Sequence, residues 1–103
     1  MHPTIDSQRD KIVEICRRFG VARLELFGSA ATAEFDPATS DFDFLVEFRT
    51  GCDLGPWMSQ YFELREELGR VLGREVDLVM AGAPRNPYFV RDLNRTRRLL
   101  YAE

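Results

Sequence analysis

Phe42-Asp43-Phe44-Leu45-Val46-Glu47-Phe48 is the stretch that decides the fold of this 103-residue chain. Side chains alternate between the two faces of a β-strand, so its apolar residues share one face, namely Phe42, Phe44, Val46 and Phe48. The opposite face carries Asp43, Leu45 and Glu47, and Asp41 comes just before them. This pattern predicts a strand that packs one face on a core and presents acidic groups on the other.

The segments before this strand predict a helix, a second strand and a turn. Asp6 or Ser7 is expected to cap the helix, and Gly20 is expected to end it; its apolar positions are Ile12, Val13, Cys16 and Phe19. Val21–Phe27 has the apolar character of a strand. Gly28-Ser29 ends that strand, residues 30–34 predict a short helix, and residues 36–40 predict a turn.

The segments after this strand predict a helix, a strand and a last helix. Pro56 is expected to start the first of these, because proline suits the first helical turn, and Gly73 is expected to end it. Its predicted buried stripe is Met58, Tyr61, Phe62, Leu64, Leu68, Val71 and Leu72. Residues 75–80 predict a third strand and residues 87–100 the last helix. The fold class is therefore α/β (α+β): one domain over residues 1–103, with a small mixed sheet of about three or four strands and helices packed against it.

The composition argues against several classes of protein. Hydrophobic residues make up 45% and charged residues 30%, as in ordinary globular domains, and the apolar runs are too short to cross a bilayer. The N-terminal residues lack the basic and apolar blocks of a signal peptide, which predicts a cytoplasmic protein. Two cysteines and one histidine are too few for a disulfide framework or a structural zinc site.

The charge pattern argues against a nucleic-acid-binding protein. The net charge is −3, whereas proteins that bind phosphate backbones broadly carry a basic surface. Four arginines do gather near the C-terminal end, at Arg91, Arg95, Arg97 and Arg98. We expect them to form a solvated or partner-facing surface rather than an RNA site.

Three aspartates carry the chemical signal. Asp41 and Asp43 leave the same face of their strand, and Asp77 interrupts another apolar strand. An aspartate is costly there unless its charge is compensated. Taken singly, Asp41 could cap a turn and Asp77 could pair with Arg74 or another arginine. Taken together, the three favour a site for divalent metal ions, which prefer oxygen ligands.

The Gly28-Ser29 turn supplies groups that carboxylates cannot. A strand-to-helix turn presents backbone N–H groups, which favour an anion. Gly28 would let the backbone approach a phosphate closely, and the Ser29 hydroxyl would donate to a phosphate oxygen. Rival motifs are missing: the sequence has no P-loop and no dinucleotide-binding glycine motif, Asp41-Phe42-Asp43 does not open a calcium loop, and His2 is a poor candidate for a serine-hydrolase triad.

These features together resemble the minimal nucleotidyltransferases (MNT) of the polymerase-β superfamily, and within that group the antitoxin partners of HEPN toxins. The resemblance is carried by LFGSAATAEFDPATSDFDFLVEF at residues 26–48, by REVDLV at residues 74–79, and by NPYFVRDLNRTRRLLYAE at residues 86–103. Many members have Arg-Gly soon after the Gly-Ser turn, where this chain has Thr32-Ala33. That departure predicts weaker binding of a triphosphate.

The resemblance implies a Mg²⁺-dependent protein adenylyltransferase that takes AMP from ATP. Asp41 and Asp43 would hold two Mg²⁺ ions, Asp77 would complete the site, and Gly28 and Ser29 would hold the leaving phosphates. The acceptor it implies is a tyrosine on a HEPN ribonuclease toxin, silenced by the modification. A homo- or hetero-oligomer is compatible with this role, and the base preference stays open.

Two alternatives stay open beside this hypothesis. One is a non-catalytic antitoxin that neutralises its toxin by binding. An exposed Trp57 or Tyr61 would support a protein interface, although burial in the core is the commoner fate of such residues. The other is a free-standing transferase for a small molecule or an RNA end.

Overall fold

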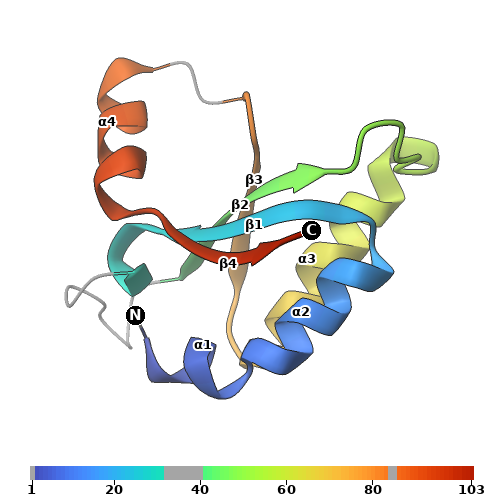
Figure 1. The fold of residues 1–103 in the computed structure, drawn as a ribbon, viewed down its shortest axis with the longest axis horizontal. Helices are drawn as coiled ribbons and strands as arrows, with labels where there is room; N and C mark the ends of the chain where they lie inside the picture. The colour runs from blue at the N-terminus through green and yellow to red at the C-terminus, as the bar shows by residue number, and fades with distance from the viewer. Residues whose placement is uncertain (1, 32–40, 84–85) are drawn as a thin grey trace.

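The computed structural model of this chain describes residues 2–31, 41–83 and 86–103. In chain order, its elements are α1 (Pro3–Ser7), α2 (Arg9–Arg18), β1 (Val21–Phe27), the 3₁₀ turn η1 (Gly28–Ala31), β2 (Phe42–Phe48), the 3₁₀ turn η2 (Pro56–Met58), α3 (Ser59–Leu72), β3 (Val76–Met80), α4 (Pro87–Thr96) and β4 (Arg98–Ala102). Figure 1 shows a central sheet with α2 and α3 side by side along it and α4 standing apart from them.

The sheet is mixed, as predicted, and has four strands in the order β3-β2-β1-β4. β1 pairs antiparallel with β2 on one side and with β4 on the other. β2 and β3 run parallel, and α3 makes the crossover between them. The pair β2 and β3 therefore brings two strand beginnings to one edge of the sheet, and both of these strands carry aspartates.

The predicted last helix is wrong over its final residues. α4 ends at Thr96, and Arg98–Ala102 forms the fourth strand instead. Arg97 takes an extended conformation, and the next residues pair with β1, which buries Leu100 and Tyr101 against the core. Periodicity could not separate the two outcomes, because the free edge of β1 that decides them lies far away in the sequence.

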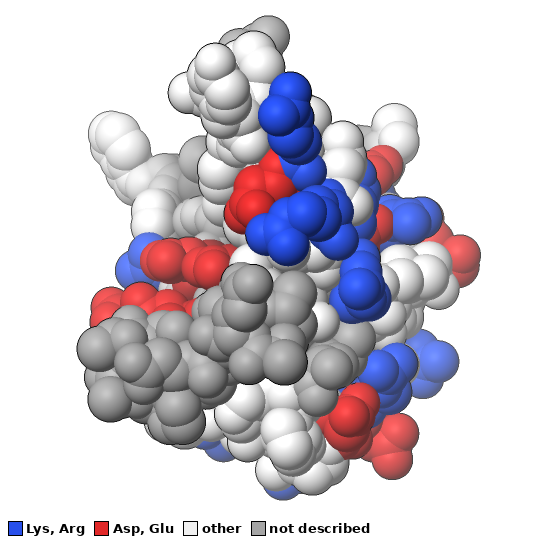
Figure 2. All heavy atoms as spheres, turned by 90° about the vertical axis from the view of Figure 1, so that its left-hand side faces the viewer, with Lys and Arg blue, Asp and Glu red and all other residues white. Residues whose placement is uncertain are grey.

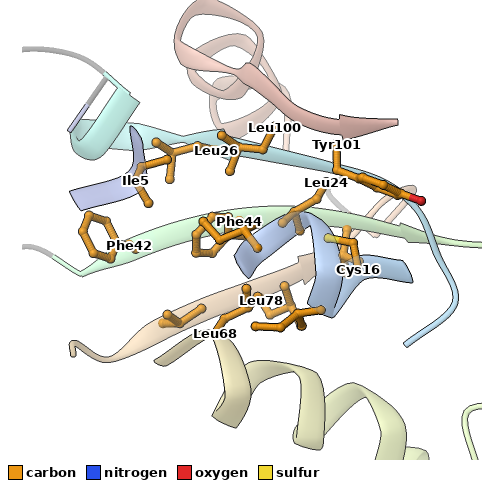
Figure 3. Close-up of a cluster of buried hydrophobic side chains, with 14 of the residues drawn as sticks. Ile5, Cys16, Leu24, Leu26, Phe42, Phe44, Leu68, Leu78, Leu100 and Tyr101 are labelled. Carbon is orange, nitrogen blue, oxygen red and sulfur yellow. The ribbon is translucent and has the colours of Figure 1, made fainter. Parts of the chain in front are cut away.

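The core lies between the sheet and the helices α1, α2 and α3. Figure 3 shows the buried side chains of Phe42 and Phe44 meeting residues from the other strands and from α2 and α3. The predicted faces of β2 are confirmed, since Phe42, Phe44 and Val46 belong to this cluster, with Phe48 packed against it. Leu45 joins a smaller cluster on the other side of the sheet with Phe27 and with Leu93 of α4. α4 therefore covers part of the face that carries the acidic residues.

The N-terminal helix differs from the prediction. Neither Asp6 nor Ser7 caps it, because both lie inside a separate short helix, α1. His2 caps that helix instead: its ring Nδ1 accepts a hydrogen bond of 3.1 Å from the backbone N–H of Thr4. α2 then begins at Arg9 without a side-chain cap. The predicted short helix at 30–34 corresponds to η1 as far as Ala31; its remainder, and the turn predicted at 36–40, lie outside the described residues.

The start of the long helix also differs. Pro56 begins η2, not α3, and both Trp57 and Met58 adopt left-handed backbone angles before α3 starts at Ser59. Met58 and Phe62 are exposed, so their predicted burial is wrong, whereas Leu64, Leu68 and Leu72 are buried as expected. Gly73 ends the helix as predicted, in the left-handed conformation that glycine adopts without strain. No helix in the described part of the chain is long and apolar enough to cross a membrane.

The contrast between two phenylalanines tests this assignment of the core. Phe44→Ala should lower the free energy of unfolding by about 3 to 5 kcal/mol, because it leaves a cavity in the centre of the core. Phe62→Ala removes the same atoms from a side chain that is 46% exposed, so it should cost less than about 1 kcal/mol. Urea denaturation of both variants measures the difference, and equal losses would contradict the assignment.

Candidate active site

Two aspartates lie side by side on the parallel strands. The register of β2 and β3 places Asp43 directly opposite Asp77, and their side chains share a hydrogen bond. Asp43 is partly buried and Asp77 is exposed. The sequence predicted that these residues would lie on neighbouring strands, and the structure brings them into direct contact. Asp77 is thus turned toward the Asp43 carboxylate.

The surroundings of Asp43 are unfavourable for a negative charge. Its pKa is raised from an ordinary 3.8 to about 6, first by burial and then by the charge of Asp77, the hydrogen bond with Asp77, and the charge of Asp41. The negative charge of Asp77 so close to Asp43 makes the ionised form of Asp43 more costly. The pair therefore favours any bound species that brings positive charge.

Asp41 lies just before β2, two residues from Asp43, and is close enough for its charge to act on that residue. Within the described residues, no group of three or more His, Cys, Asp or Glu side chains is arranged to hold a metal ion. The structure thus brings Asp43 and Asp77 together and leaves Asp41 as a neighbouring charge. Their roles as metal ligands stay predictions. Carboxylate oxygens in this electrostatic state do fit a hard divalent cation, which would relieve their repulsion.

Gly28 is the part of the predicted phosphate turn that touches this pair. It has a positive φ of 75°, and a β-carbon there would lie only 2.7 Å from Oδ2 of Asp43. Glycine is favoured at this position because the positive φ strains other residues and a β-carbon would push the carboxylate aside. The Gly28 N–H donates a hydrogen bond of 2.9 Å to the hydroxyl of Thr96. The other residue predicted here, Ser29, lies in η1 next to Gly28, and its role stays a prediction.

Thr96 is a site neighbour that the sequence analysis missed. It is 2% exposed at the last position of α4, and its hydroxyl both accepts from Gly28 and donates to the Asp92 carbonyl. A threonine on the buried side of an amphipathic helix was the available signal, but its partner depends on how α4 packs.

Glu25 on β1 is a second feature that the sequence analysis missed. It is 2% exposed, and its carboxylate accepts hydrogen bonds from Arg97 and Arg23. Burial acts to raise the pKa of Glu25, but the hydrogen bonds and charges of the two arginines outweigh it, so that pKa is lowered. Arg97 therefore neutralises a buried charge, which partly corrects the prediction of a solvated arginine cluster.

The other arginines of that cluster are more exposed. Arg95 forms an exposed ion pair of 2.7 Å with Asp92 on α4. Figure 2 faces this end of the molecule and shows basic side chains gathered in a band, with acidic side chains beside them. Such mixed charge is typical of a solvated surface.

Two pockets in the described part of the surface lie away from the aspartates. One lies between α2 and α3, where its walls include Arg18 and Glu67, and the other is small and borders Glu25 and Arg97. A pocket shared by the aspartates and the Gly28-Ser29 turn stays a prediction.

Comparison with known proteins identifies the class. The sequence profile of the nucleotidyltransferase domain matches residues 9–100. The chain is 41% identical over 75 residues to MJ0435 of Methanocaldococcus jannaschii, a match that covers 73% of this chain and 75% of that protein. It is 38% identical over 76 residues to MJ0128 of the same organism, which covers 74% and 72%. Both relatives are assigned as protein adenylyltransferases.

Solved structures share the fold. A minimal nucleotidyltransferase superposes with a TM-score of 0.73 at 28% identity, over 95% of both chains. A toxin–antitoxin structure with AMP-PNP gives a TM-score of 0.69 at 22% identity, over 92% of this chain and 73% of that one. A complex of the tri-AMPylated HEPN toxin of Shewanella oneidensis with its MNT antitoxin gives 0.64 at 20% identity, over 95% and 72%.

The chain belongs to the nucleotidyltransferase domain family, and its fold is that of a minimal nucleotidyltransferase. It is thus a transferase of nucleotides, and both the fold class and the family resemblance predicted from the sequence are confirmed. The Gly28 turn and the acidic strands β2 and β3 fall within the matched segment.

The raised pKa of Asp43 predicts a pH-dependent stability. Its folded value of about 6 lies above the unfolded value of about 3.9, so the folded state holds the proton more tightly. That contribution to stability is complete below about pH 4 and is lost as the pH rises through about 6. Asp43→Asn, which mimics the protonated form, should therefore melt several degrees above the natural protein at pH 8 in EDTA and at the same temperature near pH 4.

Melting curves across this pH range measure the difference. The exposed carboxylate of Glu66 gives a matched control, since Glu66→Gln should track the natural protein at every pH. The measured quantity is the melting temperature of Asp43→Asn minus that of the natural protein. The prediction would be contradicted if this difference were smaller at pH 8 than at pH 4.

Proposed function

We propose that this chain transfers AMP from ATP to a hydroxyl group on a partner protein, with Asp41, Asp43 and Asp77 as the acidic site and Gly28-Ser29 as the phosphate turn. The observation that carries the proposal is the contact between Asp43 and Asp77, whose shared negative charge calls for a cation. The family and the adenylyltransferase relatives support the transfer of a nucleotide, and AMP in particular.

The proposed roles follow from the position of each group. Asp43 and Asp77, with Asp41 beside them, would hold Mg²⁺, as two ions in the full complex. When bound, Mg²⁺ neutralises charge on the triphosphate and lowers the pKa of an attacking hydroxyl. Gly28 leaves the Asp43 carboxylate accessible, because it has no side chain to cover it. The backbone of η1, with Ser29, would face the β- and γ-phosphates of the departing pyrophosphate.

The Gly28 N–H already donates to Thr96, so it does not serve as a donor to a phosphate. Gly28 would contribute to phosphate binding through its lack of a side chain. Donors to phosphate would have to come from the residues that follow it. The predicted effect of Thr32, where many family members have arginine, concerns the same phosphates and stays part of the proposal.

The acceptor that we propose is a tyrosine of a HEPN-family toxin, and the chain would act as its antitoxin. The tri-AMPylated HEPN toxin bound to its MNT antitoxin provides a structural precedent in which the antitoxin chain has this fold. We also propose a cytoplasmic location, where ATP and Mg²⁺ are plentiful.

One observation favours the second candidate, an antitoxin that works by binding alone. Trp57 is 94% exposed on η2, and a large exposed aromatic side chain is typical of protein contacts. Binding and catalysis are separable by mutation, because η2 follows the end of β2 and Asp43 lies near its start.

The transfer reaction is tested with labelled ATP. The purified chain, Mg²⁺, ATP labelled in the α-phosphate and the protein encoded by the neighbouring gene should yield label on a tyrosine of that protein. Asp43→Asn and Asp77→Asn should each lower the rate by about 100-fold or more, and Glu66→Gln should leave it unchanged. The absence of label with the natural chain would refute the proposal, and toxin neutralisation that survives both aspartate changes would favour binding alone.

Binding of the metal ion is tested separately by thermal denaturation. Millimolar MgCl₂ should raise the melting temperature of the natural protein, because a ligand that binds only the folded state stabilises it. The increase should disappear in Asp43→Asn and Asp77→Asn and persist in Glu66→Gln. Equal increases in all four proteins would indicate a general salt effect and count against the site.

A further inference from the structure

Thr96 makes a hydrogen bond that the proposed chemistry does not explain. Its hydroxyl donates to the carbonyl of Asp92 at 3.0 Å, a common arrangement for threonine in a helix. The same hydroxyl accepts the backbone N–H of Gly28 at 2.9 Å, across 68 positions of sequence. Thr96 is 2% exposed, and both hydrogen bonds are partly buried.

The Gly28 end of this bond lies against the acidic pair. The 2.7 Å between a β-carbon built on Gly28 and Oδ2 of Asp43 means that backbone and carboxylate are in contact, with no side chain between them. Gly28 also follows Phe27, which faces Asp43 in the register of β1 and β2. A small displacement of the turn would therefore displace the carboxylate or open a gap beside it.

The Thr96 end is fixed by contacts that do not involve Gly28. On one side, Leu93 packs with Phe27 and Leu45 in the second hydrophobic cluster. On the other side, Arg97 donates to the buried carboxylate of Glu25, and β4 then pairs with β1. Because both flanks of Thr96 are held by the sheet, its hydroxyl is a fixed point from which the turn can be held.

We propose that Thr96 is a positioning residue for AMP transfer: its hydroxyl holds the Gly28 backbone and thereby sets the place of the Asp43 carboxylate beside Asp77. The proposal rests on the proposed function, since only there do these aspartates take part in a reaction. Thr96 itself touches neither the nucleotide nor the acceptor in this scheme. Its effect passes through the turn.

Two substitutions separate the hydroxyl from the rest of the side chain. Thr96→Val keeps the branched shape but removes the acceptor for Gly28, leaving a partly buried N–H without this partner unless the turn moves. Thr96→Ser keeps the hydroxyl and removes the methyl group. Thr50, exposed in the turn after β2, gives the matched control Thr50→Val.

The kinetic test compares kcat with KM. Thr96→Val should lower kcat for AMP transfer by about tenfold or more, because misplacement of a reacting group costs rate, while KM for ATP changes by less than about threefold. Thr96→Ser and Thr50→Val should stay within about threefold of the natural chain. A merely structural role would predict a loss that follows the melting temperature in both Thr96 variants.

The second readout does not depend on activity. Hydrogen exchange followed by NMR should show a protected Gly28 amide in the natural protein, about tenfold or more faster exchange in Thr96→Val, and natural protection in Thr96→Ser and Thr50→Val. An unprotected Gly28 amide in the natural protein overturns the proposal, and this measurement stands even if Thr96→Val does not fold. A Thr96→Ser variant that is as defective as Thr96→Val also overturns the proposal.

The two proposals fail in different ways. If the natural chain labels no partner while the Gly28 amide is protected only in the presence of the Thr96 hydroxyl, the AMP-transfer function fails and Thr96 is an anchor of the turn with no role in catalysis. If label transfer is normal and Thr96→Val keeps both the natural kcat and the natural exchange rate, the positioning role fails alone.

Discussion

The fold and the candidate site both depend on β2, because one face of this strand packs in the core and the other face carries acidic residues. β2 buries Phe42 and Phe44 in the centre of the core, while Asp43 between them lies against a second carboxylate. Parallel pairing with β3 places Asp77 directly opposite, so the repulsion is fixed by the sheet and cannot be relieved by moving one side chain away along the strand. The fold stability supplied by the apolar face thus maintains an electrostatically unfavourable pair on the other face, as expected where binding is prepared in advance.

Two carboxylates on this face, one buried and one partly buried, differ in the charges that surround them. Glu25 lies between Arg23 and Arg97, and these arginines hold its pKa below the ordinary value despite its burial. The charged groups that act on Asp43 are two other aspartates, so its pKa moves in the opposite direction. The electrostatic surroundings of Asp43 thus favour binding of a cation, whereas those of Glu25 do not.

The C-terminal segment, α4 to β4, contacts several parts of the sheet and of the candidate site. α4 covers the second hydrophobic cluster, Thr96 bonds the glycine turn, Arg97 compensates Glu25, and β4 completes the sheet beside β1. The last part of the chain thereby contacts β1, the Gly28 turn and Leu45 of β2. In so small a domain, contacts of this kind stabilise the fold and shape the site at once.

The sequence by itself determined the strands β1 and β2 to the residue and the end of α3 at Gly73. It also placed aspartates on two strands, and its resemblance to a known family indicated the class of enzyme. Alternation, glycine punctuation and the cost of aspartate in a strand act over a few residues, so they are visible in the sequence. Only the tertiary structure decided that residues 98–102 form a strand, that Glu25 is buried between two arginines, and that Thr96 holds Gly28. Each of these depends on a partner distant in the chain: an open strand edge, a guanidinium or a backbone N–H. These partners become neighbours only when the sheet forms, so the local sequence pattern does not predict them.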